Sequence, residues 1–138
     1  MPSENLAITW RRIPERYRLA GSCCENCKTN YFPIRKLCPK CRRKGKIVPK
    51  QLSGKGKIYS FTEVTSGPAG FELEVPYVLA IVELDEGPRL TAQVVGVSDK
   101  DVKFDDRVEM VFRKIMEDSC EGLIHYGYKF RLVNPRGQ

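Results

Sequence analysis

Two Cys-x-x-Cys pairs are the part of this 138-residue chain best suited to chemistry. Cys24 and Cys27 form the first pair, and Cys38 and Cys41 form the second. Each pair can present two thiolates from one tight turn, and the ten residues between the pairs allow a short hairpin to bring the turns together. This spacing is typical of a closed tetrahedral zinc site, which stabilises a small fold and leaves no open position for a substrate.

Two other interpretations of the cysteines stay open at the level of sequence. Disulfides would need an oxidising compartment, but residues 1–5 are polar and neither an export signal nor a membrane span follows, so we expect a cytoplasmic protein with reduced thiols. Iron is the alternative metal, because sulfur ligation alone does not separate it from zinc. We therefore predict that Cys24, Cys27, Cys38 and Cys41 bind zinc, with iron as the alternative.

The remaining reactive side chains do not form a recognisable catalytic group. His125 is the single histidine, and no acidic or nucleophilic neighbour in the sequence completes a dyad with it. Cys23 adjoins a predicted metal ligand, and Cys120 lies in a predicted turn. Asp105 and Asp106 are adjacent in a predicted loop, which does not position them as an acid and base pair. We predict a protein that is not an enzyme.

Charge is distributed unevenly along the chain. Residues 1–57 hold 15 Lys and Arg against three Asp and Glu, a net charge of +12, whereas residues 58–138 have a net charge of −5. A basic first part suits an anionic ligand or an acidic partner, and a solvated surface that keeps the protein soluble is the plainer interpretation. The candidates for anion binding are Arg35, Lys36, Lys40, Arg42 and Arg43.

The residues that precede the cysteines predict two short helices. Leu6, Trp10, Ile13 and Tyr17 recur at steps of four, three and four, which places them on one face of a helix. Pro14 is tolerated in the first turn of a helix but not in its interior, so we expect a break near Ile13. The apolar stripe of these four residues either packs on the rest of the protein or docks on a partner.

Five segments rich in strand-forming residues follow the cysteines. They are residues 56–64, 77–84, 90–97, 107–113 and 124–132. Glycines inside the segments and turn-forming residues between them fit a small closed barrel of the OB-fold type. The stretch 66–76 lies between the first two strands, where OB barrels often have a binding loop. We predict a mainly β chain with a helical segment (1–20), a zinc ribbon (21–49) and a five-stranded OB-fold domain (50–138).

The order of these motifs resembles a known family. The residues that support the resemblance are Trp10-Arg11-Arg12, Glu15-Arg16-Tyr17, Leu19, Gly21, Phe32-Pro33, Cys38-Pro39-x-Cys41 and the segments 111–114 and 126–130. They are similar to archaeal and bacterial proteins that combine a zinc ribbon with an OB-fold domain and accompany thiolases and HMG-CoA synthase. That family was long catalogued as a domain of unknown function.

The resemblance implies a rubredoxin-like ribbon, an OB barrel and a non-catalytic accessory subunit that bridges acyl-CoA enzymes. In the archaeal case the partners are a thiolase and HMG-CoA synthase, early in the mevalonate route to isoprenoid lipids. Acyl-CoA binding is also implied, so the five basic residues become candidates for the coenzyme A phosphates, with Tyr31 and Phe32 nearby.

The chain departs from the family pattern at two kinds of position. Asp105-Asp106 stands where many members have a turn glycine. Lys28 and Arg42 stand where a glycine often follows each cysteine pair in rubredoxin-type sites, which favours zinc over iron.

Nucleic-acid binding is the alternative function, because zinc ribbons and OB barrels both serve it in other proteins. The predicted barrel argues against it. OB barrels that bind nucleic acid stack bases on aromatic side chains of the second and third strands, where this chain offers little beyond Tyr77 and Arg89.

Overall fold

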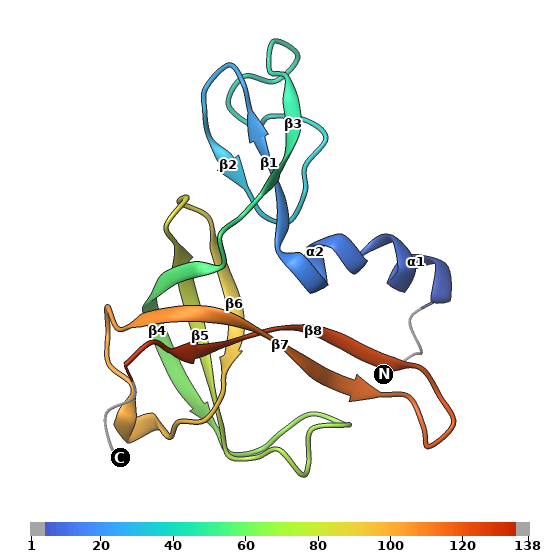
Figure 1. The fold of residues 1–138 in the computed structure, drawn as a ribbon, viewed down its shortest axis with the longest axis vertical. Helices are drawn as coiled ribbons and strands as arrows, with labels where there is room; N and C mark the ends of the chain where they lie inside the picture. The colour runs from blue at the N-terminus through green and yellow to red at the C-terminus, as the bar shows by residue number, and fades with distance from the viewer. Residues whose placement is uncertain (1–4, 135–138) are drawn as a thin grey trace.

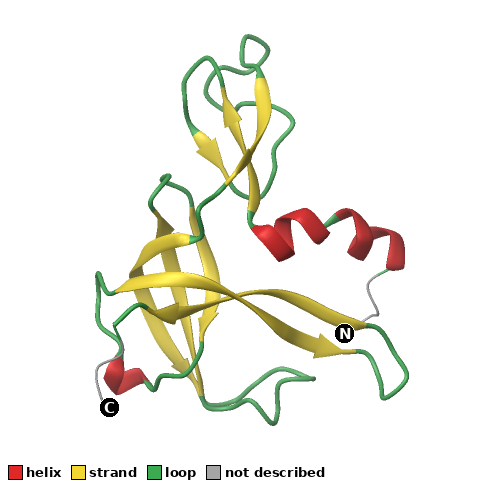
Figure 2. Cartoon of the chain, in the orientation of Figure 1, coloured by secondary structure: helices red, strands yellow, loops and turns green. Residues whose placement is uncertain are grey.

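A three-stranded sheet stands at one end of a closed β-barrel, with two short helices beside the junction, in the computed structural model of the chain (Figure 1). The structure describes residues 5–134, so the outer ends of the predicted segments 1–20 and 50–138 lie outside it. Strands and loops make up most of the described chain (Figure 2). The predicted mainly β fold, with short helices, a ribbon and a five-stranded barrel, is confirmed.

The helices are α1 (Leu6–Arg11) and α2 (Ile13–Arg18), separated near Ile13 as predicted. The side chain of Asn5 caps α1 by accepting a hydrogen bond from a backbone N–H of the first turn at 3.0 Å. Pro14 lies in the first turn of α2, where its missing N–H costs no hydrogen bond. Leu19 caps the C-terminus of α2, and its left-handed backbone (φ +50°) turns a fully buried side chain into the barrel core. Within residues 5–134, neither helix has the length or apolar character to cross a bilayer.

The ribbon sheet consists of β1 (Ala20–Cys24), β2 (Asn30–Tyr31) and β3 (Ile47–Gln51), with β1 in the middle and both pairings antiparallel. A Cβ atom on Gly21 would lie 2.6 Å from the carbonyl oxygen of Tyr31. The close approach of β1 and β2 therefore requires glycine at this position.

The barrel strands are β4 (Lys55–Val64), β5 (Tyr77–Leu84), β6 (Arg89–Val94), β7 (Arg107–Glu117) and β8 (Ile124–Leu132). They close in the order β4-β5-β6-β8-β7, and β7 pairs back to β4. The pairing of β6 with β8 is parallel, whereas the others are antiparallel. This order is that of an OB fold. The third strand begins one residue earlier and ends three residues earlier than predicted, because the chain turns at Gly96 (φ +74°), and the fourth strand is four residues longer.

Alternating apolar residues fill the barrel. In β5 the side chains of Val78, Ala80, Val82 and Leu84 all point inward and are buried. Phe130 of β8 is the largest fully buried side chain. Burying a side chain of this size stabilises the fold by about 1.5–3 kcal/mol, so the barrel has a core that does not depend on a metal.

The junction between the two modules is fixed by the turn between β5 and β6. The Glu86 carboxylate accepts a hydrogen bond from the backbone N–H of Ser53 at 2.6 Å. The backbone oxygen of Glu86 accepts another from the side chain of Asn30 in β2 at 2.9 Å. Phe32 from the ribbon packs edge-on against Tyr128 of the barrel, with ring centroids 5.7 Å apart.

The outer parts of β7 and β8 extend beyond the barrel as a two-stranded hairpin (residues 111–128), which we call the β7–β8 arm (Figure 1). The rings of Phe112 and Tyr126 stack along it with centroids 5.3 Å apart. Helix α2 lies against β8. The arm and α2 together form one wall of the cleft described below.

Candidate metal centre and barrel cleft

The four predicted cysteine ligands come together in the ribbon. The sulfur atoms of Cys24, Cys27, Cys38 and Cys41 all lie within 4.8 Å of one another. The Cys27 and Cys38 sulfurs are 3.6 Å apart. Four sulfurs at the Zn–S distance of about 2.3 Å around a tetrahedral centre would be about 3.8 Å apart, so the spacing fits a four-coordinate metal.

Each cysteine pair sits on a turn of the same form. The N–H of Lys28 donates to the carbonyl of Cys24 at 2.8 Å, and the N–H of Arg42 donates to that of Cys38 at the same distance. Both Lys28 and Arg42 have left-handed backbones, with φ of +57° and +52°. The chain therefore keeps the turn that glycine often supplies and accepts a cost of roughly 1 kcal/mol per residue.

Backbone and side-chain groups surround the sulfurs closely. A Cβ atom on Gly45 would lie 2.7 Å from Cβ of Cys38 and 3.3 Å from the sulfur of Cys24, so the backbone of Gly45 covers the site. The side-chain amide of Asn26 donates to the sulfur of Cys41 at 3.1 Å. Such outer contacts orient the ligands of a metal.

Hydroxyl groups favour the thiolate form of two ligands. Oγ1 of Thr29 lies 3.3 Å from the Cys27 sulfur, and its hydrogen bond holds the pKa of the Cys27 thiol at about 6. The contact with Cys38 raises the pKa of Tyr31 to about 12, so the tyrosine keeps its proton and donates it to that sulfur over 3.4 Å. Because thiolates are the metal-binding form, the residues present fit a metal site.

The ribbon places the other predicted residues around this centre. Arg35, Lys36, Lys40, Arg42 and Arg43 are all exposed, and none forms an ion pair with a described residue. Arg35 lies over the Tyr31 ring at 5.8 Å. Phe32 packs on the barrel, so it is not free to contact a ligand beside them. Cys23 is half-buried outside the four-cysteine group.

The helical stripe divides into two parts. Leu6 and Trp10 of α1 are exposed by 68% and 74%. Ile13 is half-buried, and Tyr17 packs edge-on against Phe112 of the β7–β8 arm. The second half of the stripe therefore serves this chain's own packing, and the first half remains open.

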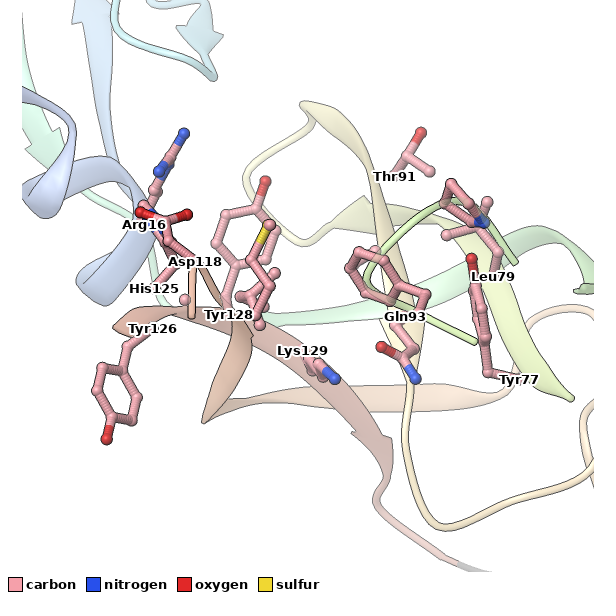
Figure 3. Close-up of a pocket in the computed structure, with 16 residues that line it drawn as sticks. Arg16, Tyr77, Leu79, Thr91, Gln93, Asp118, His125, Tyr126, Tyr128 and Lys129 are labelled. Carbon is pink, nitrogen blue, oxygen red and sulfur yellow. The ribbon is translucent and has the colours of Figure 1, made fainter. Parts of the chain in front are cut away.

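A cleft of about 490 Å³ lies between the β7–β8 arm, helix α2 and the loop 65–76 that joins β4 to β5 (Figure 3). Its walls are mainly apolar and include Phe71, Tyr77, Leu79, Ile115, Met116 and Tyr128. Loop 65–76 contains the stretch in which the sequence predicts an OB binding loop. Two polar groups lie at separate places along the cleft.

His125 and Asp118 form the first polar group, near Arg16 (Figure 3). Nε2 of His125 is 3.1 Å from Oδ1 of Asp118, and the histidine side chain is 8% exposed. The expectation that His125 has no acidic neighbour holds only along the sequence, because the hairpin turn brings Asp118 back beside it. Among the described residues that line the cleft there is no cysteine or serine, so this pair has no such nucleophile to activate there.

Lys129 and Gln93 form the second group, which the sequence does not reveal. Nζ of Lys129 is 3.1 Å from Oε2 of Glu74, and Nε2 of Gln93 donates to the same oxygen at 3.2 Å. Lys129 alternates with His125 and Gly127 on one face of β8, and all three are buried. The only sequence signal for this group is the alternation of residues with period 2 in 124–132. That alternation does not tell which face of the strand lines a cleft.

Comparisons with known proteins show which family has this architecture. A family model described as the rubredoxin-like zinc ribbon domain of ChsH2 matches residues 11–46, and the ChsH2 C-terminal OB-fold domain matches residues 49–113. A "DUF35 domain-containing scaffold protein" of Methanocaldococcus jannaschii is 52% identical over 125 residues, which cover 91% of this chain and 89% of the relative.

Two further proteins extend the comparison. Subunit BbsA of benzoylsuccinyl-CoA thiolase from Thauera aromatica is 34% identical and covers 83% of this chain and 76% of its own. A solved structure titled "Ltp2-ChsH2(DUF35) aldolase" superposes with a TM-score of 0.70 at 28% identity, over 97% of this chain and all of that one. The chain therefore belongs to the DUF35 family, whose members join a ChsH2-type zinc ribbon to an OB-fold domain.

Proposed function

We propose that this protein is a non-catalytic accessory subunit that binds a thiolase-type enzyme and bridges it to an HMG-CoA synthase-type enzyme. The strongest support is the combination of the names of its relatives with the exposed apolar surface of this chain. Relatives across most of the chain are named as scaffold proteins and as a thiolase subunit. The same chain exposes apolar side chains that its own fold leaves uncovered. The process would be the mevalonate route to isoprenoids or a related acyl-CoA pathway in the cytoplasm.

The docking surface in this proposal is the open half of the helical stripe. Leu6, Ile8 and Trp10 of α1 are all exposed, and Trp10 is exposed by 74%. Exposed apolar side chains that lie together mark interaction sites, and tryptophan is enriched among the residues that dominate binding energy at interfaces. Ile124 at the start of β8 and Phe112 of the β7–β8 arm add further exposed apolar area.

Acyl-CoA binding belongs to the same proposal. The cleft has the apolar walls and occasional polar groups that suit an acyl or pantetheine chain. The exposed basic residues Arg35, Lys36, Lys40, Arg42 and Arg43 on the ribbon are the candidates for the phosphate groups of coenzyme A. Their charges have no carboxylate partner among the described residues, which leaves them free to attract a polyanion.

Zinc is the metal that we propose for the four cysteines. Four thiolates complete a tetrahedron, and the matching domain is described as a zinc ribbon. Zinc would hold the two turns of the ribbon together, and it has no substrate position in such a site. The metal thus serves the fold of the basic module, while binding belongs to the surfaces around it.

The test is purification of the tagged protein from its native host, with identification of every enzyme that accompanies it. We expect a thiolase-type and an HMG-CoA synthase-type enzyme in stable proportion. Trp10→Ala should reduce the recovery of at least one of them, because the exposed ring is lost while the core is unchanged. Phe104→Ala is the matched control, since Phe104 is 66% exposed in the loop before β7. Recovery of neither enzyme with the wild-type protein would refute the proposal.

A further inference from the structure

Two side chains on adjacent barrel strands converge on one carboxylate oxygen in the cleft. Nζ of Lys129 in β8 and Nε2 of Gln93 in β6 lie 3.1 Å and 3.2 Å from Oε2 of Glu74. Strands β6 and β8 are neighbours in the closed barrel, so the two donors are held by paired backbone. Figure 3 shows Lys129 and Gln93 next to each other, away from the group of Asp118 and His125.

The ammonium group of Lys129 is the more constrained of the two donors. Its side chain is only 7% exposed, and Glu74 is the one carboxylate that pairs with it among the described residues. A buried charge is strongly unfavourable without a partner of opposite sign. The site therefore strongly favours an anion at this position, although that anion need not be Glu74.

Glu74 differs from its donors in where it comes from. It belongs to loop 65–76, outside the barrel strands, and its side chain is 36% exposed. The donors are thus fixed in the barrel wall, and the acceptor reaches them from a connecting loop. An external carboxylate can take the place of Glu74, so that the ammonium group has a partner both before and after the exchange.

The surroundings define what such a carboxylate would be attached to. Lys129 and Gln93 line the cleft of about 490 Å³ together with Tyr77, Leu79 and Phe71. The space next to the two donors is therefore bounded by aromatic and aliphatic side chains. A carboxylate at the end of an apolar chain matches this combination better than a hydrated inorganic anion, which would lose its water against apolar walls.

We propose that Lys129 and Gln93 form a carboxylate-binding subsite of the cleft, occupied in this structure by Glu74, which takes the free carboxylate of an acidic acyl chain. The inference deepens the proposed acyl-CoA binding by naming the chemistry of the acyl group, and it rests on that function for the carrier of the chain. Glu74 then acts as an internal competitor. The ligand binds only to molecules in which Glu74 has left the site. Its apparent affinity is therefore the intrinsic affinity multiplied by the fraction of molecules with a vacant site.

The experiment measures binding of hexanoate to the purified full chain by titration calorimetry, with hexanamide as the uncharged probe of the same shape. Glu74→Ala should bind hexanoate at least tenfold more tightly than the wild type, because the competitor is gone. Glu72→Ala is the matched control on the same loop, where the Glu72 carboxylate accepts a hydrogen bond from the backbone N–H of Gly70 at 2.8 Å. It should leave the affinity unchanged. Lys129→Met should abolish hexanoate binding.

A second variant keeps the test decisive if Glu74→Ala melts below the working temperature. Glu74→Gln retains the shape of the side chain but removes its charge, so it should also bind hexanoate more tightly than the wild type. Hexanoate should raise the melting temperature of either variant more than that of the wild type, since it restores a partner to Lys129.

Three results would overturn the subsite. The first is equal hexanoate affinity in the wild type and both Glu74 variants. The second is a gain in hexanamide affinity in the Glu74 variants as large as the gain in hexanoate affinity. The third is tighter binding of inorganic phosphate than of hexanoate. The measurement needs no partner enzyme, so it separates this inference from the proposed function. Absence of hexanoate binding together with co-purification of the expected enzymes refutes the subsite alone. The reverse pattern refutes the bridging function alone.

Discussion

The ring of Tyr17 in α2 meets the ring of Phe112 in β7 edge-on, with centroids 5.0 Å apart and 73° between the ring planes. Phe112 in turn stacks on Tyr126, so a row of three rings connects the N-terminal helices to the β7–β8 arm. The helices have no fully buried side chain of their own. This row of rings is therefore one of the contacts that hold the helices beside the cleft.

Tyr17→Ala should lower the free energy of unfolding by about 1–3 kcal/mol, since it removes one aromatic pair and the burial of a half-buried ring. Urea denaturation measures the change. Tyr17→Phe keeps the ring and is the control, which should stay within about 0.5 kcal/mol of the wild type. Equal stability of all three proteins would show that the row of rings does not hold the helices.

Cys38→Ser should abolish stoichiometric metal binding and unfold the ribbon, because three sulfurs and a hydroxyl do not replace four thiolates. The barrel should remain folded on its own core. Elemental analysis gives the metal content, and backbone NMR signals separate the two modules. Cys23→Ser is the control at a thiol outside the four-cysteine group, and it should keep the metal. Unchanged zinc content in Cys38→Ser would contradict the ligand assignment.

Metal binding should be lost on acidification. The pKa of the Cys27 thiol is lowered to about 6 by its hydrogen bond with Thr29. Because this pKa is lowered from an ordinary value of 9.0, the stability linked to the thiolate is complete above about pH 9 and is lost as the pH falls from there to about 6. Bound metal lowers the pKa further, so release should occur below about pH 6. A colorimetric chelator follows the released zinc.

The same hydrogen bond provides a variant for this pH test. Thr29→Val removes the hydroxyl, raises the thiol pKa and should move metal release to higher pH. Thr65→Val, on the loop after β4, is the control and should show the wild-type profile. Release from the wild type already above pH 7, or identical profiles for Thr29→Val and the wild type, would be inconsistent with the role of Thr29.

Asp105 occupies a left-handed conformation, with φ of +63°, at the position where the family resemblance leads us to expect a turn glycine. Asp105→Gly should leave the free energy of unfolding unchanged or raise it by up to about 1 kcal/mol. It relieves backbone strain, loses the exposed ion pair with Lys57 and increases the freedom of the unfolded chain. Asp105→Ala loses the ion pair and keeps the strain, so it should be less stable than the wild type. Thermal unfolding ranks the three proteins, and a glycine variant less stable than the alanine variant would contradict the assignment.

The features that the sequence predicts are those encoded locally. Cysteine spacing predicted which four thiols lie together, and runs of strand-forming residues predicted the barrel strands to within a few positions. The pairs that line the cleft depend instead on long-range register. Glu74 and Lys129 are 55 residues apart, and their contact follows from the closure of the barrel and the course of loop 65–76.

The helical stripe illustrates the same limit. Spacing places Leu6, Trp10, Ile13 and Tyr17 on one face, but nothing local tells which of them meets the β7–β8 arm. The arm itself arises because β7 continues beyond the predicted end at residue 113. Which half of the stripe stays exposed is therefore decided by the contact between Tyr17 and Phe112, two residues about a hundred positions apart in the sequence.

Glu86 joins the barrel to both the connecting segment and the ribbon, through Ser53 and Asn30. In a subunit that binds two enzymes, the angle between its two modules determines how the two enzymes are oriented relative to each other. In the proposed bridging role, a change at Glu86 would alter the relative orientation of the bound enzymes while leaving each binding surface intact. The efficiency with which an intermediate passes from one enzyme to the other would then depend on a residue that contacts neither.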